Sequence, residues 1–396
     1  MWPKQARLPA MDPCIWLLDA STYIFRAYYS TASRPGGPPV MSTADGLPTN
    51  ALLVFTQMLR RLVRRYNPEH MAIVFDHRDP SFRKVKYPAY KANRGATPED
   101  LIPQFPYFRP IAEALGLVCV ECAEFEADDI IATLASHAQA NQWESVIVSS
   151  DKDLYQLLTG GVHMLDEPKK QWVDDSIIDK TFGVHAHQVT EVQGLMGDAT
   201  DNIPGVPGIG PKRASKLIHT YGSLEQVYAH LSELKGKLRE NLETYKNDAF
   251  LSRELATLRL DTPISTALDG YAVQDHDPDL IETVFTTLEF HHLLREFRRL
   301  ESDVLHMPHT VDSPPSSSLE PSESVQPTLA ENDSPAGHPE IEDGPAAGTP
   351  VPHAEVSETP PSVPSPVNTP AQPAEQLLLP LAGTLPSSAP NAHGSR

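Results

Sequence analysis

The stretch Cys14-Ile15-Trp16-Leu17-Leu18-Asp19 decides the fold that the sequence predicts, because a short, continuous apolar run ends there in a carboxylate. Such a run, without polar alternation, is typical of a strand buried on both faces of a parallel sheet. Similar runs follow at residues 71–75, 117–120 and 146–148, and helical patterns lie between them at residues 51–66, 110–115 and 128–137. This alternation predicts a doubly wound, mostly parallel α/β domain over residues 12–184.

Charge and proline are spread unevenly along the 396 residues. The formal net charge is −20, and an acidic chain is normally a poor partner for nucleic acid. Residues 302–396, however, hold 12 acidic residues, 19 of the 39 prolines and no Phe, Tyr or Trp, which leaves residues 1–301 with a net charge of −9. Such a segment cannot bury enough apolar surface to offset its chain entropy, so we predict a disordered, acidic Pro/Ser-rich tail.

The composition excludes several classes of protein. Three cysteines (Cys14, Cys119 and Cys122) cannot form a disulfide framework, and they favour a reduced, cytoplasmic setting. No apolar run approaches the ~18 residues that span a bilayer, so no membrane association is expected. The segment from Met11 reads as a natural start, and residues 1–11 are interpreted as an N-terminal extension.

Acidic residues gather where the predicted strands end. The set comprises Asp19, Asp76, Glu126, Asp128, Asp129, Asp151, Asp153, Asp198 and Asp201. Ligands of parallel α/β sheets bind outside the carboxyl ends of the strands, so we expect these side chains to converge on one edge. Crowded carboxylates raise each other's pKa unless cations compensate them, and ligands that are all oxygen favour Mg²⁺ or Mn²⁺. The pattern predicts a site for two or more such ions, suited to phosphodiester hydrolysis.

Each acidic residue also has an ordinary structural interpretation. An Asp after a strand is often a helix cap or turn former, and Asp151 and Asp153 are placed to cap the helical stretch that follows them. Glu126 and Asp128 are placed to complement a helix dipole. Because five separate strand exits and loops carry acid, a shared metal site is the better interpretation of the whole set.

The charge changes sign between Asp76 and Pro98. Basic and aromatic residues interleave there, at Arg78, Phe82, Arg83, Lys84, Lys86, Tyr87, Tyr90, Lys91 and Arg94. Cations that neutralise phosphates and rings that stack on bases are typical of a single-strand binding element. A solvated basic helix face is the alternative, but the position directly after a predicted metal ligand favours nucleic acid.

A glycine-rich turn lies between Ile203 and Ile218, inside a predicted helical domain over residues 185–301. Its glycines precede a helix that begins at Pro211 and carries basic residues; the set is Gly205, Gly208, Gly210, Lys212, Arg213 and Lys216. Backbone N–H groups at such a helix start can hold a phosphate without reading base sequence. The pattern predicts a helix-hairpin-helix that grips duplex backbone, with a plain interhelical turn as the alternative.

Several motifs, all in order, resemble those of a known family. They are Leu18-Asp19-Ala20-Ser21-Thr22-Tyr23, Val74-Phe75-Asp76, Ser81-Phe82-Arg83, Tyr87-Pro88-Ala89-Tyr90-Lys91-Ala92-Asn93-Arg94, Glu126-Ala127-Asp128-Asp129, Ser150-Asp151-Lys152-Asp153-Leu154, and Leu195-Met196-Gly197-Asp198 through Gly210. Over about residues 12–300 the chain resembles the 5′→3′ exonuclease domain of bacterial DNA polymerase I, within the flap endonuclease family.

The resemblance implies a PIN-like fold with a helical arch at about residues 77–108, and a structure-selective 5′→3′ exonuclease and 5′-flap endonuclease that uses two metal ions. All nine acidic residues match metal-site carboxylates of the family. The arch region, which receives the 5′ strand and helps to stabilise the scissile phosphate, is matched by Tyr90, Lys91 and Arg94, with Arg83 in the same segment. The glycine turn matches the hairpin, which in this family commonly involves a potassium ion.

The implied substrates are 5′ flaps, nicks and RNA–DNA primer junctions, met during bacterial DNA replication and repair near the nucleoid. The family's polymerase and proofreading domains have no counterpart in the sequence, so a stand-alone, monomeric nuclease is expected. Two rival functions remain. The complete acidic set argues against a catalytically silent flap-binding or clamp-recruited scaffold, and the duplex-gripping hairpin argues against a PIN-like ribonuclease.

One segment of the tail, residues 376–381, differs from the rest in its large apolar residues. Its residues Gln376, Leu377, Leu379 and Leu381 resemble the peptides by which bacterial repair proteins dock on the DNA sliding clamp. A glutamine that hydrogen-bonds and leucines that fill a pocket suit a peptide that folds on binding. A chance leucine cluster in a low-complexity linker is an equal alternative.

Overall fold

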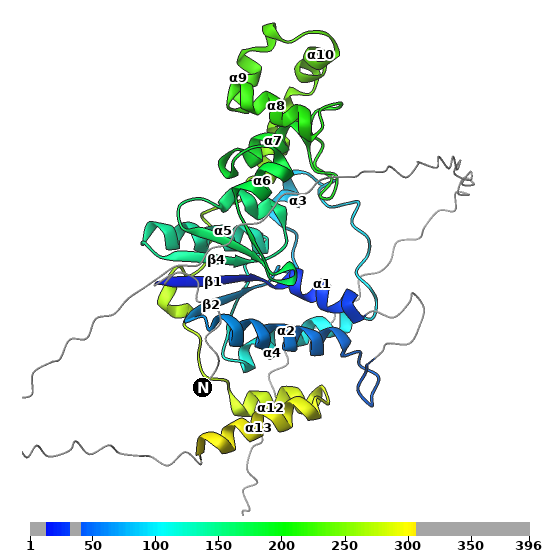
Figure 1. Ribbon diagram of the computed structural model, residues 1–396. Helices are drawn as coiled ribbons and strands as arrows, with labels where there is room; N and C mark the ends of the chain where they lie inside the picture. Colours follow the sequence, from blue (N-terminus) through cyan, green and yellow to red (C-terminus); the bar gives the residue numbers. More distant parts are fainter. Residues whose placement is uncertain (1–12, 32–40, 306–396) are drawn as a thin grey trace, which may run out of the picture. The chain divides into compact units, whose positions relative to one another are not determined.

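The computed structural model describes residues 13–31 and 41–305, and a six-stranded sheet forms the centre of this part of the chain (Figure 1). The strands are β1 (Cys14–Asp19), β2 (His70–Val74), β3 (Val118–Val120), β4 (Glu144–Val148), β5 (Val162–Asp166) and β6 (Gln171–Val173). They lie in the order β3-β2-β1-β4-β5-β6, and every neighbouring pair is parallel except β5 and β6. The predicted doubly wound α/β fold is therefore confirmed, and the four predicted strands are β1 to β4.

The side chains of β1 alternate between two apolar cores, because successive strand residues point to opposite faces of a sheet. Ile15 and Leu17 lie in a core with buried residues of α5 (Ala127–Ala140). Trp16 and Leu18 lie in a second core with residues of three further helices, which are α1 (Ala20–Thr31), α2 (Asn50–Tyr66) and α4 (Phe105–Ala114). Figure 1 shows α5 on one side of the sheet and α1, α2 and α4 on the other.

A helical domain follows β6. Its helices are α6 (Asp175–Phe182), α7 (Val189–Met196), α8 (Pro211–Tyr221), α9 (Leu224–Ala229), α10 (Gly236–Thr244) and α11 (Lys246–Ala256). Helices α7 and α11 approach closely at Gly194, where a Cβ atom would lie 2.9 Å from the Cβ of Arg253. The apolar core on the α5 side of the sheet continues into this domain through Val192 and Leu195. The helical domain is thus joined to the sheet by one continuous core.

The last two helices differ from the expectation of a single helical domain that continues to residue 301. Helix α12 (Pro278–Thr287) and helix α13 (His291–Leu305) return to the sheet, where Phe285 and Phe297 lie in the core with α2 and α4. The chain is guided back by backbone bonds from Val273 to Glu69 and from Gln274 to Gly116. Helix α13 also extends to Leu305, beyond the predicted boundary at residue 301.

The predicted helical arch at about residues 77–108 contains little helix. It holds α3 (Phe82–Lys86), then a series of turns, and the helical signal returns only with η1 (Ile102–Gln104) and the start of α4. Prolines at positions 80, 88, 98 and 103 explain this, because proline removes a backbone donor and disfavours helix in the residue before it. The other 3₁₀ turns are η2 (Lys152–Leu157), η3 (Glu167–Lys169), η4 (Ala186–Gln188), η5 (Leu231–Glu233) and η6 (Leu268–Tyr271).

Some predictions fall outside the residues that the structure describes. These are the N-terminal extension at residues 1–11, the tail beyond Leu305 and the candidate clamp peptide at residues 376–381. Within the described ranges, no helix combines the length and apolarity needed to cross a bilayer.

Candidate active site

Carboxylates from three neighbouring strands meet at one edge of the sheet. Asp19 is the last residue of β1, Asp76 follows β2, and Asp151 follows β4 as the N-cap of η2. The N-terminus of α5 brings Asp128 to the same place. Burial raises the pKa of Asp128 well above its usual range, and the negative charges of Asp151, Asp19 and Asp76 raise it further. Convergence of these acids, expected from the strand ends, is thus visible in their mutual electrostatic effects.

The Asp19 carboxylate is held by two hydroxyl groups and one backbone amide. Its Oδ2 accepts hydrogen bonds from Ser149 Oγ at 2.8 Å and from Thr22 Oγ1, and its Oδ1 accepts one from the Thr22 amide at 3.2 Å. Burial raises its pKa to about 6, and the nearby charge of Asp76 contributes. The side chain is therefore held in a single orientation while its charged form remains under-compensated.

Asp151 and Asp153 combine the structural and the functional interpretations. Asp151 caps η2, as the alternative reading expected, because its Oδ1 accepts a hydrogen bond from the Asp153 amide at 2.9 Å. Asp153 Oδ1 accepts one from Gln193 Nε2 at 2.6 Å. Burial raises the pKa of Asp153 to about 7, with Asp151 and Asp198 as the next causes, and burial also raises the pKa of Asp151. Asp151 is thus both the N-cap of η2 and a member of the acidic cluster.

The predicted role of Asp129 does not agree with the structure. Asp129 and Glu126 form a capping box at the start of α5, and the Asp129 carboxylate is fully buried. Its oxygens accept hydrogen bonds from Arg83 Nη1 at 2.6 Å, from Arg83 Nη2 at 2.7 Å and from the amides of Glu126 and Arg259. With every oxygen engaged inside the protein, Asp129 is not available to an ion at the sheet edge.

Arg83, predicted as a phosphate-facing cation, belongs to this interior pair. Its side chain is only 1% exposed, and its Nε donates to the Leu255 carbonyl at 2.7 Å. Its Nη2 also donates to the Thr257 carbonyl at 3.2 Å. Its Nη1 also donates to Glu126 Oε2 at 3.3 Å. Arg83 therefore joins α3 and the start of α5 to the end of α11, and it does not reach a substrate in this conformation.

The other three predicted catalytic residues of the arch are Tyr90, Lys91 and Arg94, and they lie against the carboxylates. Tyr90 Oη lies 3.0 Å from Glu126 Oε2 and 3.1 Å from Asp201 Oδ2. Lys91 Nζ lies 3.1 Å from Glu126 Oε1, and Arg94 Nη2 lies 2.5 Å from Asp201 Oδ1. Burial lowers the pKa of Lys91, but the charges of Glu126 and Asp201 outweigh it and raise the pKa overall. Burial and the same two carboxylates raise the pKa of Tyr90.

As the side chains stand, no three His, Cys, Asp or Glu residues in the described part of the chain are arranged as a metal-binding group. Glu126 and Asp201 instead face the chain's own cations, Lys91 and Arg94. The remaining members of the cluster offer only carboxylate oxygens. Burial raises the pKa values of Asp19, Asp128, Asp151 and Asp153, and the charges of neighbouring carboxylates raise them further. A hard divalent cation relieves this situation, so the donor set fits such an ion once Lys91 and Arg94 turn away.

Asp198 completes the set from the helical domain. Its backbone pairs with Ile203 through two hydrogen bonds, of 3.0 Å and 2.7 Å, and its Oδ1 accepts one from the Thr200 amide at 2.6 Å. The raised pKa of Asp153 shows that the charges of Asp198 and Asp201 act on it. A pocket of about 340 Å³ opens beside the cluster, and among its lining residues are Asp76, Lys84, Tyr90, Lys91, Arg94 and Glu126.

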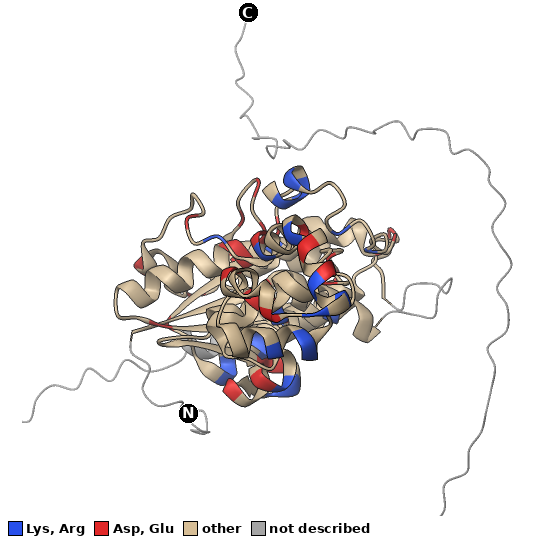
Figure 2. Ribbon diagram, turned by 90° about the horizontal axis from the view of Figure 1, so that it is seen from above, with Lys and Arg blue, Asp and Glu red and all other residues tan. Residues whose placement is uncertain are grey.

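Five of the six predicted hairpin residues, all except Gly205, line one open groove of about 670 Å³. The groove is lined by Gly208, Gly210, Pro211, Lys212, Arg213 and Lys216. Helix α8 begins there without a side-chain cap; Pro211 has no N–H group, and the amides of Arg213 and Ala214 donate to the Gly210 carbonyl at 3.0 Å. Gly205 packs against the Gly197 backbone instead: its φ is 61°, and a Cβ atom there would lie 2.3 Å from the Gly197 nitrogen. Figure 2 shows Lys and Arg segments next to Asp and Glu segments on this side of the molecule.

Three residues that hold the site were missed by the sequence analysis. Ser149 orients Asp19, Gln193 orients Asp153, and Ser81 Oγ donates to Glu126 at 3.1 Å. Ser149 precedes the predicted Ser150–Asp151 motif by one residue, so its position was a usable signal. Gln193 lies inside a helix of another domain, and nothing in its spacing indicates a contact with Asp153.

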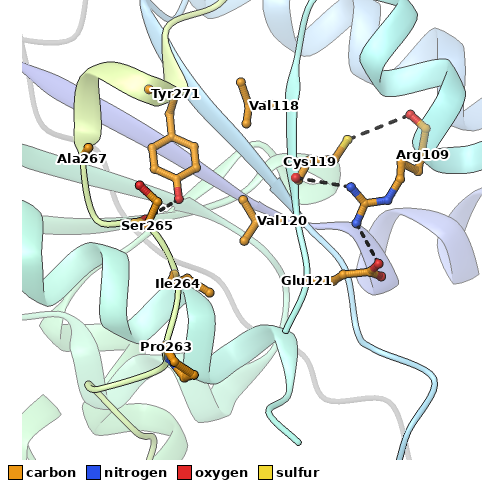
Figure 3. Close-up of a pocket in the computed structure, with 11 residues that line it drawn as sticks. Arg109, Val118, Cys119, Val120, Glu121, Pro263, Ile264, Ser265, Ala267 and Tyr271 are labelled. Atoms are coloured by element: carbon orange, nitrogen blue, oxygen red, sulfur yellow. Dashed lines mark hydrogen bonds and ion pairs between the residues drawn. The ribbon is translucent and has the colours of Figure 1, made fainter. Parts of the chain in front are cut away.

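A further pocket, of about 490 Å³, lies at the edge strand β3 and holds none of the predicted site residues (Figure 3). Tyr271 Oη donates to the Ser265 carbonyl at 2.6 Å on one side of it. Arg109 lies on the other side, where it donates to the Cys119 carbonyl at 3.3 Å and pairs with Glu121 at 3.2 Å. Burial raises the pKa of Cys119 to about 12, so its thiol is protonated at neutral pH.

Comparison with known proteins agrees with a sheet-containing domain followed by a helical domain. Residues 14–183 match a family model described as the 5′-3′ exonuclease, N-terminal resolvase-like domain, and residues 184–279 match the model of the 5′-3′ exonuclease, C-terminal SAM fold. The chain therefore belongs to the 5′-3′ exonuclease family.

Two relatives illustrate how far the similarity extends. DNA polymerase I of Rhizobium leguminosarum is 40% identical over 289 residues, which is 71% of this chain and 28% of that protein. DNA polymerase I of Bacillus caldotenax is 36% identical over 293 residues, which is 72% of this chain and 32% of that protein. The chain thus spans about a third of the length of these relatives, namely the part that carries the nuclease motifs.

One solved structure shares the fold. The T5 5′-exonuclease with bound divalent metal ions (zinc) aligns with a TM-score of 0.51 at 21% identity, covering 69% of this chain and 98% of that chain. At this identity the likeness concerns the fold alone. It supports the arrangement of a mostly parallel sheet followed by a helical domain.

Proposed function

We propose that this protein is a Mg²⁺-dependent, structure-selective 5′→3′ exonuclease and 5′-flap endonuclease. It would act at 5′ flaps, nicks and RNA–DNA primer junctions, and it would remove flaps and RNA primers during bacterial DNA replication and repair in the cytoplasm. The observation that carries the proposal is the acidic edge of the sheet, where burial and then the charges of neighbouring carboxylates raise the pKa values of Asp128 and Asp153. Family membership supports the choice of nucleic acid as the substrate.

The chain's own residues divide into three groups with different tasks. The proposed ligands of the divalent ions are Asp19, Asp76, Glu126, Asp128, Asp151, Asp153, Asp198 and Asp201. When bound, the ions would supply Lewis-acid activation of water and charge neutralisation at the scissile phosphate. Lys91 and Arg94, which face Glu126 and Asp201 in this structure, would turn to the phosphate and offset the charge that develops on it. Tyr90 would hold the carboxylates of Glu126 and Asp201 in place through hydrogen bonds from its hydroxyl group.

The hairpin groove is the proposed binding site for the duplex next to the cleaved strand. Lys212, Arg213 and Lys216 are exposed around it, and these cations would bind backbone phosphates without reading a base edge. Specificity would then come from the shape of the DNA. We also propose that the potassium ion implied by the family resemblance binds at this hairpin.

Cleavage of a 5′-labelled flap duplex in Mg²⁺ tests the proposal, with Asp151→Ala as the matched loss-of-site variant. We expect the wild type to release a labelled 5′ product and Asp151→Ala to be slower by a factor of ~10³ or more, because a lost metal-site ligand removes charge stabilisation. Cleavage that survives the substitution, or no cleavage by the wild type, would refute the assignment. A single-stranded RNA of the same sequence, cleaved in preference to the flap, would favour a ribonuclease.

For residues 376–381 we propose docking on the DNA sliding clamp. Tethering through the tail (residues 302–396) would raise the local concentration of the nuclease at nicks and flaps. Deleting residues 376–381 should abolish capture by the immobilised clamp and leave cleavage of a free flap oligonucleotide unchanged. Unchanged capture would contradict the docking role.

A further inference from the structure

Two segments of different domains interlock at the acidic edge. We call residues 87–94 the arch turn and residues 197–203 the carboxylate loop. The Lys91 amide donates to the Asp201 carbonyl at 2.8 Å, which joins the two backbones directly. Asn202 Nδ2 donates to the Ala89 carbonyl at 2.6 Å, and Asn93 Nδ2 donates to the Ala199 carbonyl at 2.6 Å. Each segment thus presents an asparagine amide to a carbonyl of the other.

One non-glycine residue of each segment has a left-handed backbone conformation. Lys91 has φ 54° and Asn202 has φ 57°, in the left-handed region that costs most residues about 1–2 kcal/mol. Asparagine tolerates that region better than lysine does, because its short polar side chain bonds locally. The carboxylate loop is closed by the backbone pair of Asp198 with Ile203. Its shape is therefore set before it meets the arch turn.

An apolar cluster lies beneath the two segments. Tyr90 of the arch turn and Ile203 of the carboxylate loop pack with Leu255 and Ala256 at the end of α11, and all four side chains are buried. The carboxylate loop leads directly into the hairpin, where the Gly205 amide donates to Ser252 Oγ at 2.9 Å. The arch turn is thus attached to the helical domain by hydrogen bonds to the carboxylate loop and by apolar contacts with Ile203 and the end of α11.

We propose that Asn202, with Asn93 in support, is a positioning residue that fastens the arch turn to the carboxylate loop, so that the duplex-binding hairpin sets the place of Lys91 and Arg94. The inference rests on the proposed function and gives it a source of selectivity. A phosphate meets both cations in the right place when the adjoining duplex is held by the hairpin. Asn202 is half-buried and Asn93 is exposed, so water competes less with the Asn202 bond and this bond carries most of the effect.

Four variants of the full chain isolate this bond. Asn202→Gly keeps the left-handed conformation and removes the amide, and Asn202→Asp keeps the size but replaces the donor by an acceptor. Asn93→Ala removes the second bond. The matched control is Asn141→Ala, because Asn141 Nδ2 also donates to a backbone carbonyl, that of His137 at 2.8 Å, at the far end of α5.

The first readout is amide hydrogen exchange, which does not depend on activity. Both Asn202 variants should raise exchange in residues 89–94 and leave α5 unchanged, whereas Asn141→Ala should not affect residues 89–94. The second readout is the single-turnover rate on a flap duplex and on a single-stranded oligonucleotide with the same 5′ sequence. Misplacement of the cations should lower the flap rate by about 10-fold to 100-fold and the single-strand rate much less, so that the ratio of the two falls.

Wild-type exchange at residues 89–94 in the Asn202 variants would overturn the fastening role. An equal loss of rate on both substrates would overturn the link to selectivity, since it would indicate a general loss of catalysis. If the wild type cleaves neither substrate, the proposed function fails, and exchange at residues 89–94 still decides whether Asn202 fastens the arch turn.

Discussion

Arg83 and Asp129 form a bidentate ion pair in the interior of the protein, with N–O distances of 2.6 Å and 2.7 Å and side-chain exposures of 1% and 0%. The two residues belong to motifs that suggested a substrate contact and a metal ligand. Their further partners are backbone groups at the end of α11 and just after it, and Arg83 Nη1 also lies 3.3 Å from Glu126 Oε2. The pair therefore ties the base of the arch to the start of α5, next to the proposed ligand Glu126.

Removing one partner of this pair should destabilise the fold strongly. Arg83→Met leaves the Asp129 carboxylate buried without its cation, and breaking a buried pair costs about 3–5 kcal/mol. We expect a loss of this size in the free energy of unfolding, measured by urea denaturation without metal. Arg259→Met is the control, because Arg259 pairs with Asp261 at an exposed position and should cost below ~1 kcal/mol. Equal, small losses in both variants would contradict the structural role of Arg83.

The stability of the metal-free protein should fall as the pH rises. The folded-state pKa values of Asp19 (about 6) and Asp153 (about 7) are raised, so their protonated forms favour the folded state. This contribution is present at low pH and is lost as the pH passes through these values. Mg²⁺ should therefore raise the melting temperature more at about pH 8 than at about pH 5.5.

Differential scanning fluorimetry in EDTA and in excess Mg²⁺ measures this difference. Asp153→Asn removes one of the titrating groups and should weaken the pH dependence, while it lowers the stabilisation by Mg²⁺. The prediction fails if Mg²⁺ stabilises the wild type equally at both pH values.

Lys91 should oppose metal binding and assist catalysis. Its ammonium lies 3.1 Å from Glu126 Oε1, so a divalent ion must displace it from a proposed ligand. Lys91→Met keeps the length of the side chain and removes the charge. We expect tighter Mn²⁺ binding in calorimetry together with flap cleavage that is slower by about 10²–10³-fold, since one cation no longer stabilises the transition state. Weaker Mn²⁺ binding in this variant would show that Lys91 does not compete with the ion.

Two glycines of the hairpin should respond differently to alanine. Gly205 has φ 61°, and a Cβ atom would lie 2.3 Å from the backbone nitrogen of Gly197. Gly210 has an extended conformation, and a Cβ atom there has nothing within 4 Å. Gly205→Ala should thus lower the melting temperature and weaken duplex binding, whereas Gly210→Ala should leave the melting temperature unchanged. Binding is measured by fluorescence anisotropy with a blunt duplex, and equal melting temperatures of the two variants would contradict the packing argument.

The sequence predicted the centre of the fold because buried parallel strands are read from apolar runs. It missed β5, in which His163 interrupts the run, and β6, in which only Trp172 and Val173 are apolar. It assigned α12 and α13 to the helical domain because helical periodicity indicates an apolar face but not its partner. Only the structure shows that Phe285 and Phe297 pack under the sheet.

For the candidate site, the sequence could place acids at strand ends but could not tell which way each side chain points. Asp128 and Asp129 are neighbours in one motif, yet the first belongs to the acidic cluster and the second is fully buried against Arg83. Residues on successive helix positions point about 100° apart, so adjacent acids rarely share a role. The contacts of Gln193 and Asn202 cross between domains and leave no periodic signal.

The placement of Arg109 beside β3 has a consequence for self-association. Strand β3 lies at one end of the sheet, where an unpaired backbone edge is a template for another copy of the chain. Arg109 occupies the Cys119 carbonyl on this strand and pairs with Glu121 just beyond it. A second strand would have to displace a guanidinium and bury two charges before it could add to the sheet. The contact that helps to line a pocket thus also hinders the addition of a further strand at this edge of the sheet.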